Sequence, residues 1–503
     1  MKKKLAWLIY LLGMVMLLSS MWGNHHGMKN HRVHGWNWYH YWVGSKYHEE
    51  VGYFDMYSQT IAAWREMKAD TAKVSSSRNL RTYKMKRVWE GKVPWVRNQL
   101  WTDARWAEFK SDLRKLRKKQ SYKKWNDCVK DRGYNASPAW NTPASWLTNA
   151  LDVGKSSHIR FAKSIDMGLI LGLALLLPLA FGPTRSITAV FISLLVANNT
   201  TRFHGSFVQY DWIVLVLGSA ALISKKKHGW GGFLLGVATA VRIFPLVFFA
   251  AMVARAVLDL LLTRRLPPWL PRLAGGFGLA LILGFGVGAA GPRGLDGWSE
   301  WREKIQVHTH FHKTGDGRVG LNHIFTSKQG PRGQDIPKIS ERFKTLEETK
   351  PIRLAVAGLL LALLAAACWN RDELDCFILA IVAFFALTVS SRYYWSALAL
   401  LPFLGFRTRD KASLGIGLSI SLFLTASYYL FCEDLGHTYV RWRAQNFFML
   451  GTFTLGLITL AALGFRKPLY VPGEEPRPEP GSLPESAPQT ESTPPASGES
   501  DSP

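Results

Sequence analysis

Acidic residues and cysteines are the scarce classes in this chain of 503 residues. Aspartate and glutamate number 36 against 62 lysines and arginines, which gives a formal net charge of +26 at pH 7. A positive charge of this size favours an anionic partner, either a lipid headgroup or a phosphate-bearing substrate. The basic residues are spread over segments that flank apolar stretches, so we do not expect a nucleic acid as partner.

Cysteine spacing and standard motifs exclude several classes of site. The cysteines have no metal-like CxxC spacing and form no dense disulfide framework; they are Cys128, Cys368, Cys376 and Cys432. The sequence also has no Walker A motif, no GxGxxG after a predicted strand and no HExxH. These patterns would have indicated a phosphate loop, a dinucleotide site or a zinc peptidase.

The most informative feature of the sequence is the order of its apolar and polar segments. An apolar stretch, Leu5–Trp22, follows the basic N-terminus and lacks a small-residue cleavage site, so we predict an uncleaved anchor. A long polar, basic and tryptophan-rich region follows, and only then a series of apolar segments. We therefore expect a large first loop on the far side of a membrane.

The apolar segments predict an all-α polytopic membrane protein with about twelve transmembrane helices, several of them short. After the anchor, the predicted spans are Ile165–Phe181, Ile187–Ala197, Val208–Ile223, Gly231–Val241, Phe244–Leu262, Leu273–Ala290, Ile352–Cys368, Phe377–Val389, Tyr394–Leu404, Leu414–Phe431 and Phe447–Leu463. The C-terminal region is rich in Pro, Glu and Ser, which predicts a disordered tail. The predicted regions are an anchor at 1–22, a helical extracytoplasmic first loop at 23–163, a first group of bundle helices at 164–290, an extracytoplasmic loop at 291–350, a second group of bundle helices at 351–465 and a tail at 466–503.

Basic residues in the short loops set the expected orientation. If the N-terminal lysines are cytoplasmic, strict alternation puts the basic turns, among them Lys225–Lys227 and Arg264–Arg265, on the same side. Both termini are then cytoplasmic. The polar segments that reach the outer side are Asn198–Ser206, Val241–Pro245, 291–350, Ser390–Trp395 and Glu433–Arg443. We expect an active site where these segments meet the first loop.

Two regions of the first loop have helical spacing. In His48–Trp64 the apolar residues and tyrosines suit a helix that lies flat on the outer leaflet. Trp101–Tyr134 alternates charge and aromatic residues, which predicts one or two exposed helices. This second region is either a solvated cap or a basic platform for a lipid phosphate or an acidic glycan.

Several segments resemble a known family. Gly231–Val253 (GGFLLGVATAVRIFPLVFFAAMV) and Val389–Trp395 (VSSRYYW) are similar to segments of the bacterial polyprenyl-phosphate-mannose-dependent mannosyltransferases, which belong to the GT-C superfamily of membrane glycosyltransferases. His40–Tyr47 and Arg132–Trp140 are similar to the first loop of uncharacterised membrane proteins of the same superfamily. One departure is Asn37, because that group tends to have an acid just before the His-Tyr-Tyr.

The resemblance implies a GT-C-like fold and an inverting hexosyltransferase in a bacterial inner membrane. Such an enzyme would move a sugar, mannose by analogy, from a polyprenyl-phosphate donor to a glycan, lipid or protein acceptor. The alternatives are a transporter or flippase of lipid-linked sugars, since about twelve spans suit one, and an inactive homologue, since Asn37 replaces an acid. Two similar halves, common in transporters, are not visible.

This chemistry needs a carboxylate base, cations for the leaving phosphate and an apolar groove for the lipid. The candidate bases are Asp55, Glu50 and Glu49, just beyond the anchor. Arg242 interrupts an apolar run and is the first choice for the phosphate, with an ion pair as the competing role. Asp211 is expected to pair with Arg202 or Arg242. The other substrate-binding candidates are Arg392, Arg202, His204, His40, Asn322 and His323.

The alternating His308, His310 and His312 would share one side of an extended strand and could bind a metal only if the backbone turned. Contacts with substrate or headgroups are the preferred interpretation. We therefore predict no cofactor, and a divalent metal stays an open alternative.

Overall fold

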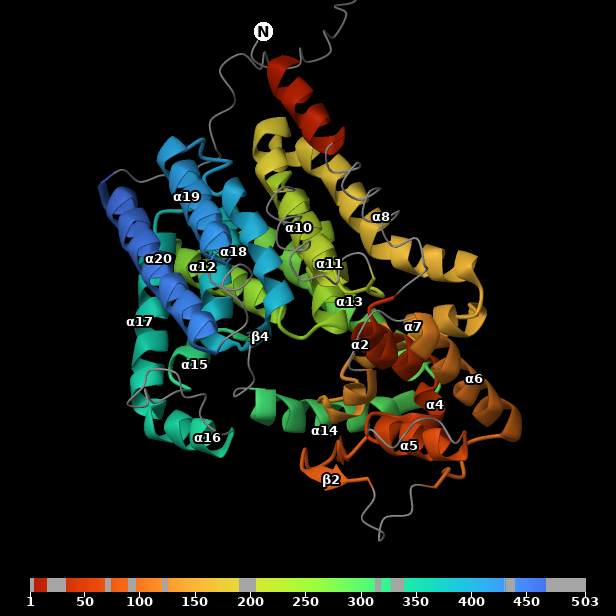
Figure 1. Ribbon diagram of the computed structural model, residues 1–503. Helices are drawn as coiled ribbons and strands as arrows, with labels where there is room; N and C mark the ends of the chain where they lie inside the picture. The colour runs from red at the N-terminus through yellow and green to blue at the C-terminus, as the bar shows by residue number, and fades with distance from the viewer. Residues whose placement is uncertain are drawn as a thin grey trace, which may run out of the picture.

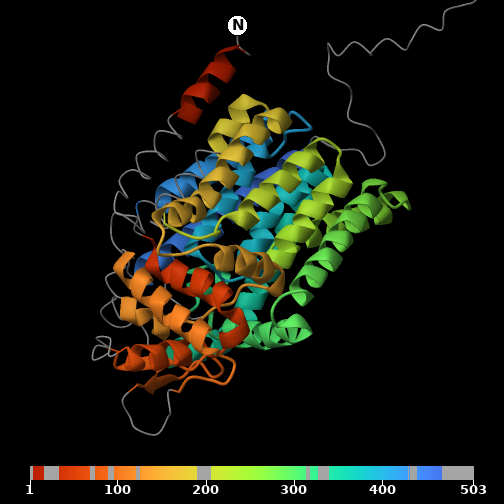
Figure 2. The same ribbon diagram turned by 90° about the vertical axis from the view of Figure 1, so that its right-hand side faces the viewer.

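A computed structural model describes residues 4–15, 33–67, 74–88, 96–119, 125–189, 205–312, 318–326, 339–428, 430 and 439–466. These residues are mostly helical, with two short two-stranded sheets. A bundle of long helices fills one region of the molecule, and smaller helices cover one end of it (Figure 1). The N-terminal helix Lys4–Val15 lies toward the opposite end in both views (Figure 2).

The bundle follows the predicted apolar segments closely. A further helix over 183–189 precedes the break in the described residues, and its end overlaps the predicted span Ile187–Ala197. The bundle helices are α8 (Ser156–Phe181), α10 (Asp211–Ser224), α11 (His228–Val241), α12 (Leu246–Thr263), α13 (Trp269–Ala289), α17 (Lys350–Cys368), α18 (Glu373–Leu387), η4 (Arg392–Phe403, a 3₁₀ helix), α19 (Lys411–Tyr428) and α20 (Tyr439–Arg466).

Five helices within the described residues are long and apolar enough to cross a membrane. They lie in α8, α12, α13, α17 and α20, and shorter apolar helices occur at Lys4–Val15, Asp211–Ser224 and Tyr394–Phe403. Large apolar side chains point outward from these helices; Ile282 of α13, for example, is 70% exposed. An exposed apolar surface of this kind suits lipid rather than water, so the chain has the character of an α-helical membrane protein.

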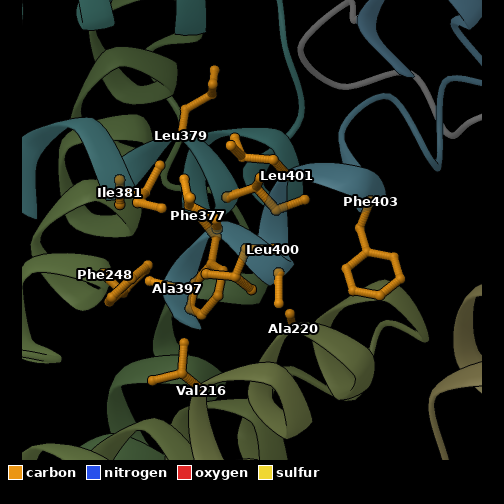
Figure 3. Close-up of a cluster of buried hydrophobic side chains, with 14 of the residues drawn as sticks. Val216, Ala220, Phe248, Phe377, Leu379, Ile381, Ala397, Leu400, Leu401 and Phe403 are labelled. Carbon is orange, nitrogen blue, oxygen red and sulfur yellow. The ribbon is translucent and has the colours of Figure 1, made fainter. Parts of the chain in front are cut away.

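Helix α18 lies at the centre of the bundle. Its side chains are buried from Glu373 to Phe385, on all sides of the helix, as expected when every neighbour is protein. Figure 3 shows Phe377 and Ile381 of α18 among Phe248 of α12, Val216 of α10 and Leu400 of η4. The short predicted segment at 377–389 is therefore a protein-enclosed core helix.

Helices α11 and α13 pack through small residues. A Cβ added at Gly232 would lie 2.0 Å from the carbonyl oxygen of Leu273, and one at Gly276 would lie 1.9 Å from that of Gly229. The two backbones can approach this closely because these positions have no side chain. On the other side of α11, a Cβ at Gly231 would lie 2.8 Å from Ile223 of α10. Gly231 and Gly232 thus have a packing role.

The first loop forms a compact unit with an aromatic core. Trp38 and Trp42 stack at 4.6 Å, and Tyr53 and Tyr134 stack at 5.7 Å. All four side chains are buried. The elements of this first-loop domain are α2 (Gly35–Asn37), η1 (Trp38–Val43, a π-helix), α3 (Gly44–Lys46), α4 (His48–Val51), α5 (Met56–Glu66), β1 (Ser76–Arg78), β2 (Met85–Arg87), α6 (Asp103–Lys119), η3 (Trp125–Lys130) and α7 (Pro138–Ala150).

Two expectations for this domain need correction. The apolar face of His48–Trp64 packs inside the domain rather than on a leaflet, since Val51, Tyr57 and Ile61 are at most 2% exposed. Helix α6 confirms the predicted helix in Trp101–Tyr134, but it buries one side: Phe109 and Leu116 are inaccessible. The aromatic residues in both segments supply a protein core, which hydrophobic periodicity alone does not distinguish from a membrane-facing stripe.

The loop after α13 contributes α14 (Gly294–His312), β3 (Arg318–Val319), α15 (Leu321–Ile324) and α16 (Ile339–Glu348). Helix α14 runs along the end of the bundle beside the first-loop domain (Figures 1 and 2). Its histidines are helical, which corrects the extended strand considered above: residues two apart on a helix diverge in direction. Strand β3 pairs antiparallel with β4 (Ser390–Ser391), so Arg318 lies opposite Ser391.

Candidate functional site

Arg242 lies at a break between two bundle helices. Helix α11 ends at Val241 because Arg242 is extended, with φ −145° and ψ 110°, and α12 begins only after Pro245. Proline cannot donate the hydrogen bond of a continuing helix, so the chain turns here. The side chain of Arg242 is only 7% exposed. A buried guanidinium next to an apolar helix is expected to have either a function or an ion-pair partner.

The contacts of Arg242 come from the bundle and from the first-loop domain. One guanidinium nitrogen lies 3.6 Å from Asp211 Oδ1 and 3.4 Å from the carbonyl oxygen of Val208, and another lies 3.4 Å from Tyr41 Oη. The rings of Tyr41 and Trp140 lie 5.4 and 5.8 Å from its charge. The predicted ion pair between Asp211 and Arg242 is thus confirmed, although its distance is long for a strong hydrogen bond.

Asp166 is a second acid beside this pair, and the sequence reasoning missed it. It is fully buried in α8, and its carboxylate accepts hydrogen bonds from the backbone N–H groups of Gln209, at 2.9 and 3.0 Å, and Tyr210, at 3.0 Å. An aspartate inside the predicted span Ile165–Phe181 was the signal that could have found it, since such charges are costly unless they have a role.

Asn37 fastens the same turn from the other side. Its Oδ1 accepts the backbone N–H of Phe207 at 2.7 Å. The next residue, Val208, has φ 43°, which a β-branched side chain adopts only under strain. Asn37 and Asp166 together hold this strained turn beside Arg242. In the candidate site, Asn37 is therefore a hydrogen-bond partner of the backbone, where the resemblance would place an acid.

A chain of hydrogen bonds connects Arg242 to α14. Tyr41, which contacts Arg242, donates to Asn135 Oδ1 at 3.3 Å, and Asn135 Nδ2 lies 3.2 Å from His308 Nε2. His308 Nδ1 lies 3.1 Å from the hydroxyl of Tyr83, which donates to the carbonyl oxygen of Arg132. The connection fixes the position of α14 relative to Arg242.

Lys304 closes the far end of this chain. It is buried and donates to the same carbonyl oxygen of Arg132 at 2.7 Å. Burial lowers its pKa to about 7, against the opposing charge of Asp131. A lysine with this pKa changes its charge near neutral pH.

An apolar pocket adjoins the polar cluster. It is small, with space for about one water molecule, and Ser396 is in its wall. Tyr210, whose N–H donates to Asp166, is also in the wall, so the pocket and the carboxylate meet at this residue. The other lining residues are Ile170, Leu173, Leu177, Ile213, Val214 and Leu217.

The three predicted bases have other surroundings. Glu50 is buried, and its Oε1 accepts a hydrogen bond from Arg105 at 2.7 Å, as an ion pair inside the first-loop domain. Glu49 and Asp55 are exposed. Within the described residues none of the three contacts Arg242, whereas Asp211 does. Their catalytic role stays a prediction that these contacts do not support.

The other predicted substrate contacts divide into three groups. His40 lies inside the first-loop domain, 2.7 Å from both the Trp36 carbonyl oxygen and Tyr57 Oη. Asn322 accepts a hydrogen bond from Arg353, and His323 is inaccessible to solvent. Arg392 begins η4, while Arg202 and His204 lie outside the described residues.

One contact brings the Arg392 region to Arg242. The rings of Phe244 and Tyr394, each two residues beyond one of these arginines, meet at 4.3 Å. The segments Gly231–Val253 and Val389–Trp395 are thus in contact through these two rings.

Among the residues that the structure describes, no three His, Cys, Asp or Glu side chains are grouped as a metal site would require. Comparisons with family models, with curated proteins and with solved structures found no match to this chain.

Proposed function

We propose that this chain is a membrane glycosyltransferase that takes a sugar from a polyprenyl-phosphate donor at the end of the bundle covered by the first-loop domain. The observation that carries the proposal is the buried Arg242, paired with Asp211 and close to Asp166, at the end of an apolar helix bundle. A donor of this kind has an anionic phosphate directly joined to an apolar chain. A guanidinium at the end of an apolar helix bundle offers a partner for the phosphate beside apolar surface for the chain.

Asp211 is the preferred base. Its Oδ1 accepts the backbone N–H of Trp212 at 2.8 Å, and its Oδ2 has no hydrogen-bond partner within the described residues. Asp166 is less suited, because backbone N–H groups already occupy both of its oxygens. In the proposed step Asp211 takes the proton of the acceptor hydroxyl. That oxygen bonds to the anomeric carbon, and the bond to the phosphate oxygen breaks.

Arg242 then stabilises the charge that the leaving phosphate acquires. The bond-breaking electron pair passes to the phosphate oxygen, and a positioned guanidinium stabilises that oxygen most in the transition state. By the resemblance, we propose mannose as the sugar and a glycan, a lipid or a protein as the acceptor. We also propose that the chain lies in a bacterial inner membrane, with about twelve spans and with both termini in the cytoplasm.

The test is a transfer assay on purified full-length protein in liposomes with radiolabelled polyprenyl-phosphate mannose and a panel of acceptors. Arg242→Gln and Asp211→Asn are each expected to reduce transfer at least about a hundredfold, as loss of a transition-state contact does. Arg302→Gln, an exposed change on α14, is the matched control. Asp55→Asn and Glu50→Gln test the candidate bases of the first-loop domain.

Three outcomes would contradict the proposal in different ways. Full activity of Asp211→Asn together with loss in Asp55→Asn would move the base to the first loop. Wild-type protein that moves labelled lipid between leaflets without transfer would be a flippase. Protein that binds donor but does neither would be an inactive homologue.

A further inference from the structure

Four arginines gather around the short helix α15; they are Arg318, Arg342, Arg353 and Arg443, here called the arginine cluster. Arg353 of α17 donates to the side chain of Asn322, and Arg443 of α20 donates to the carbonyl oxygen of Ile324 at 2.9 Å. Arg318 of β3 donates to Ser391 Oγ at 2.5 Å. Segments that are distant in the sequence thus place guanidinium groups around the four residues of α15.

The backbone beneath the cluster is held firmly. Asn446 accepts the N–H of Gly320 at 2.8 Å and donates to the carbonyl oxygen of Arg318 at 2.9 Å. Gly320 has φ 141°, and a Cβ there would lie 2.3 Å from the carbonyl oxygen of Thr388. Only glycine fits this turn. A fixed turn of this kind preorganises the side chains that bond to it.

Among the described residues, the cluster brings four guanidinium groups to one short helix. The bonds that Arg353 and Arg443 make to Asn322 and Ile324 go to neutral oxygens, which orient a guanidinium without neutralising it. The carboxylate of Glu347 is close enough to Arg353 to interact with it electrostatically. Burial, and then the charges of Arg342, Arg318 and Arg443, lower the pKa of His323 to about 3.

The cluster is also within reach of a ligand. The side chains of Arg318, Arg353 and Arg443 are half-buried, so some of each side chain faces outward. All four cations are arginines, whose planar fork matches the oxygens of phosphate in two directions at once.

We propose that the arginine cluster binds the phosphate group of a second ligand, separate from the one at Arg242. The phosphate would belong either to a lipid headgroup or to a phosphorylated sugar. The arginine cluster and Arg242 lie at the same end of the bundle. Arg318 of the cluster lies on β3, which pairs with β4, and β4 leads into Tyr394, whose ring contacts Phe244 beside Arg242. Phosphate binding at the arginine cluster does not depend on the proposed glycosyl transfer, since none of the four arginines takes part in that reaction.

The test titrates inorganic phosphate into full-length Arg242→Gln protein in detergent, with binding followed by calorimetry at constant ionic strength. The Arg242→Gln background removes the other expected phosphate site. Adding Arg443→Gln or Arg353→Gln is expected to weaken binding at least tenfold. Arg302→Gln on the exposed side of α14 is the matched control and should leave the affinity unchanged. Size-exclusion profiles verify folding, and if one variant aggregates the other carries the comparison.

Two further titrations identify the source of the phosphate. A hexose 6-phosphate that binds more tightly than phosphate indicates a phosphorylated sugar, and a short-chain phosphatidic acid that does so indicates a lipid. The proposal is overturned if chloride at equal ionic strength gives the same heat as phosphate. It is equally overturned if Arg443→Gln and Arg353→Gln bind phosphate as tightly as their parent. Loss of transfer in Arg242→Gln has no bearing on either result.

Discussion

At the scale of single residues, Arg242 takes its position from a domain that is remote in sequence. Its contact with Tyr41 and the further contacts to Asn135 and His308 join the bundle, the first-loop domain and α14. A change at Tyr41 therefore reaches the guanidinium without removing it. Such a change tests the effect of the position of Arg242 on activity while its charge is kept.

Tyr41→Phe removes the hydroxyl between Arg242 and Asn135 but keeps the ring beside the guanidinium. We expect the transfer rate to fall about tenfold, the effect of one lost hydrogen bond to a charged group. The melting temperature should change little. Tyr39→Phe is the matched control, because the Tyr39 hydroxyl bonds Thr60 at 2.8 Å, away from Arg242. Equal activity of the two variants would show that the chain of hydrogen bonds does not position Arg242.

Buried histidines make the stability of the first-loop domain sensitive to acid. Burial, with a smaller effect of Arg293, lowers the pKa of His48 to about 3. Below the usual histidine pKa of about 6.5, the unfolded chain takes up a proton that the folded chain does not. The stabilisation is complete above that pH and is lost as the pH falls toward 3.

His48→Phe should therefore flatten the decline of unfolding free energy between pH 6 and 4. The expected difference in slope is about 1.4 kcal/mol per pH unit, the effect of one proton. Chemical unfolding followed by tryptophan fluorescence at several pH values measures it. Trp146→Phe, an exposed change on α7, is the control for altered aromatic content. An unchanged slope in His48→Phe would mean that His48 titrates alike in both states.

At the scale of elements, the contact between α11 and α13 depends on glycines at particular positions. Gly276 faces the carbonyl oxygen of Gly229, whereas its neighbour Gly275 has nothing within 4 Å of an added Cβ. The two glycines are adjacent in one helix and differ only in the direction they face. They form a matched pair for testing close helix packing.

Gly276→Ala should destabilise the protein by about 2–3 kcal/mol, because the added methyl group separates two packed backbones. Gly275→Ala should be neutral or slightly stabilising, since alanine favours a helix by up to about 1 kcal/mol over glycine. Thermal unfolding of the two variants in detergent compares them directly. Similar melting temperatures would rule out the close approach of α11 and α13.

At the scale of the whole molecule, the two ends of the bundle differ in what covers them. The first-loop domain and α14 cover one end, and the N-terminal helix lies toward the other (Figure 1). The turn at Lys225–Lys227 connects α10 and α11 at the end of these helices away from Arg242. If the chain spans a bacterial inner membrane as proposed, these ends face opposite compartments.

Cysteine labelling tests this arrangement in whole cells. In a background with the four native cysteines replaced, Arg302→Cys on α14 should react with a membrane-impermeant maleimide. Lys226→Cys should react only after the membrane is permeabilised. Both side chains are exposed, so accessibility within the protein does not decide the result. The reverse pattern would invert the proposed orientation and place Arg242 toward the cytoplasm.

Much of the fold could be predicted because hydropathy and helical spacing are local properties. The expected spans at Gly231–Val241 and Leu273–Ala290 match α11 and α13 within a few residues. Arg242 was identifiable for the same reason, as a charge inside an apolar run. Asp166 carries the same signal, but one acid in a long helix does not reveal which backbone groups it binds.

What the sequence alone determined is the set of apolar helices, the large basic first loop and the exceptional position of Arg242. Only the tertiary structure decided that Asp211 pairs with Arg242, that Asp166 binds the backbone of the neighbouring turn, and that Glu50 pairs with Arg105. It also decided that the aromatic face of α5 packs inside the domain. Periodicity states which side of a helix is apolar, but the partner of that side, and of each buried charge, depends on contacts between segments far apart in the chain.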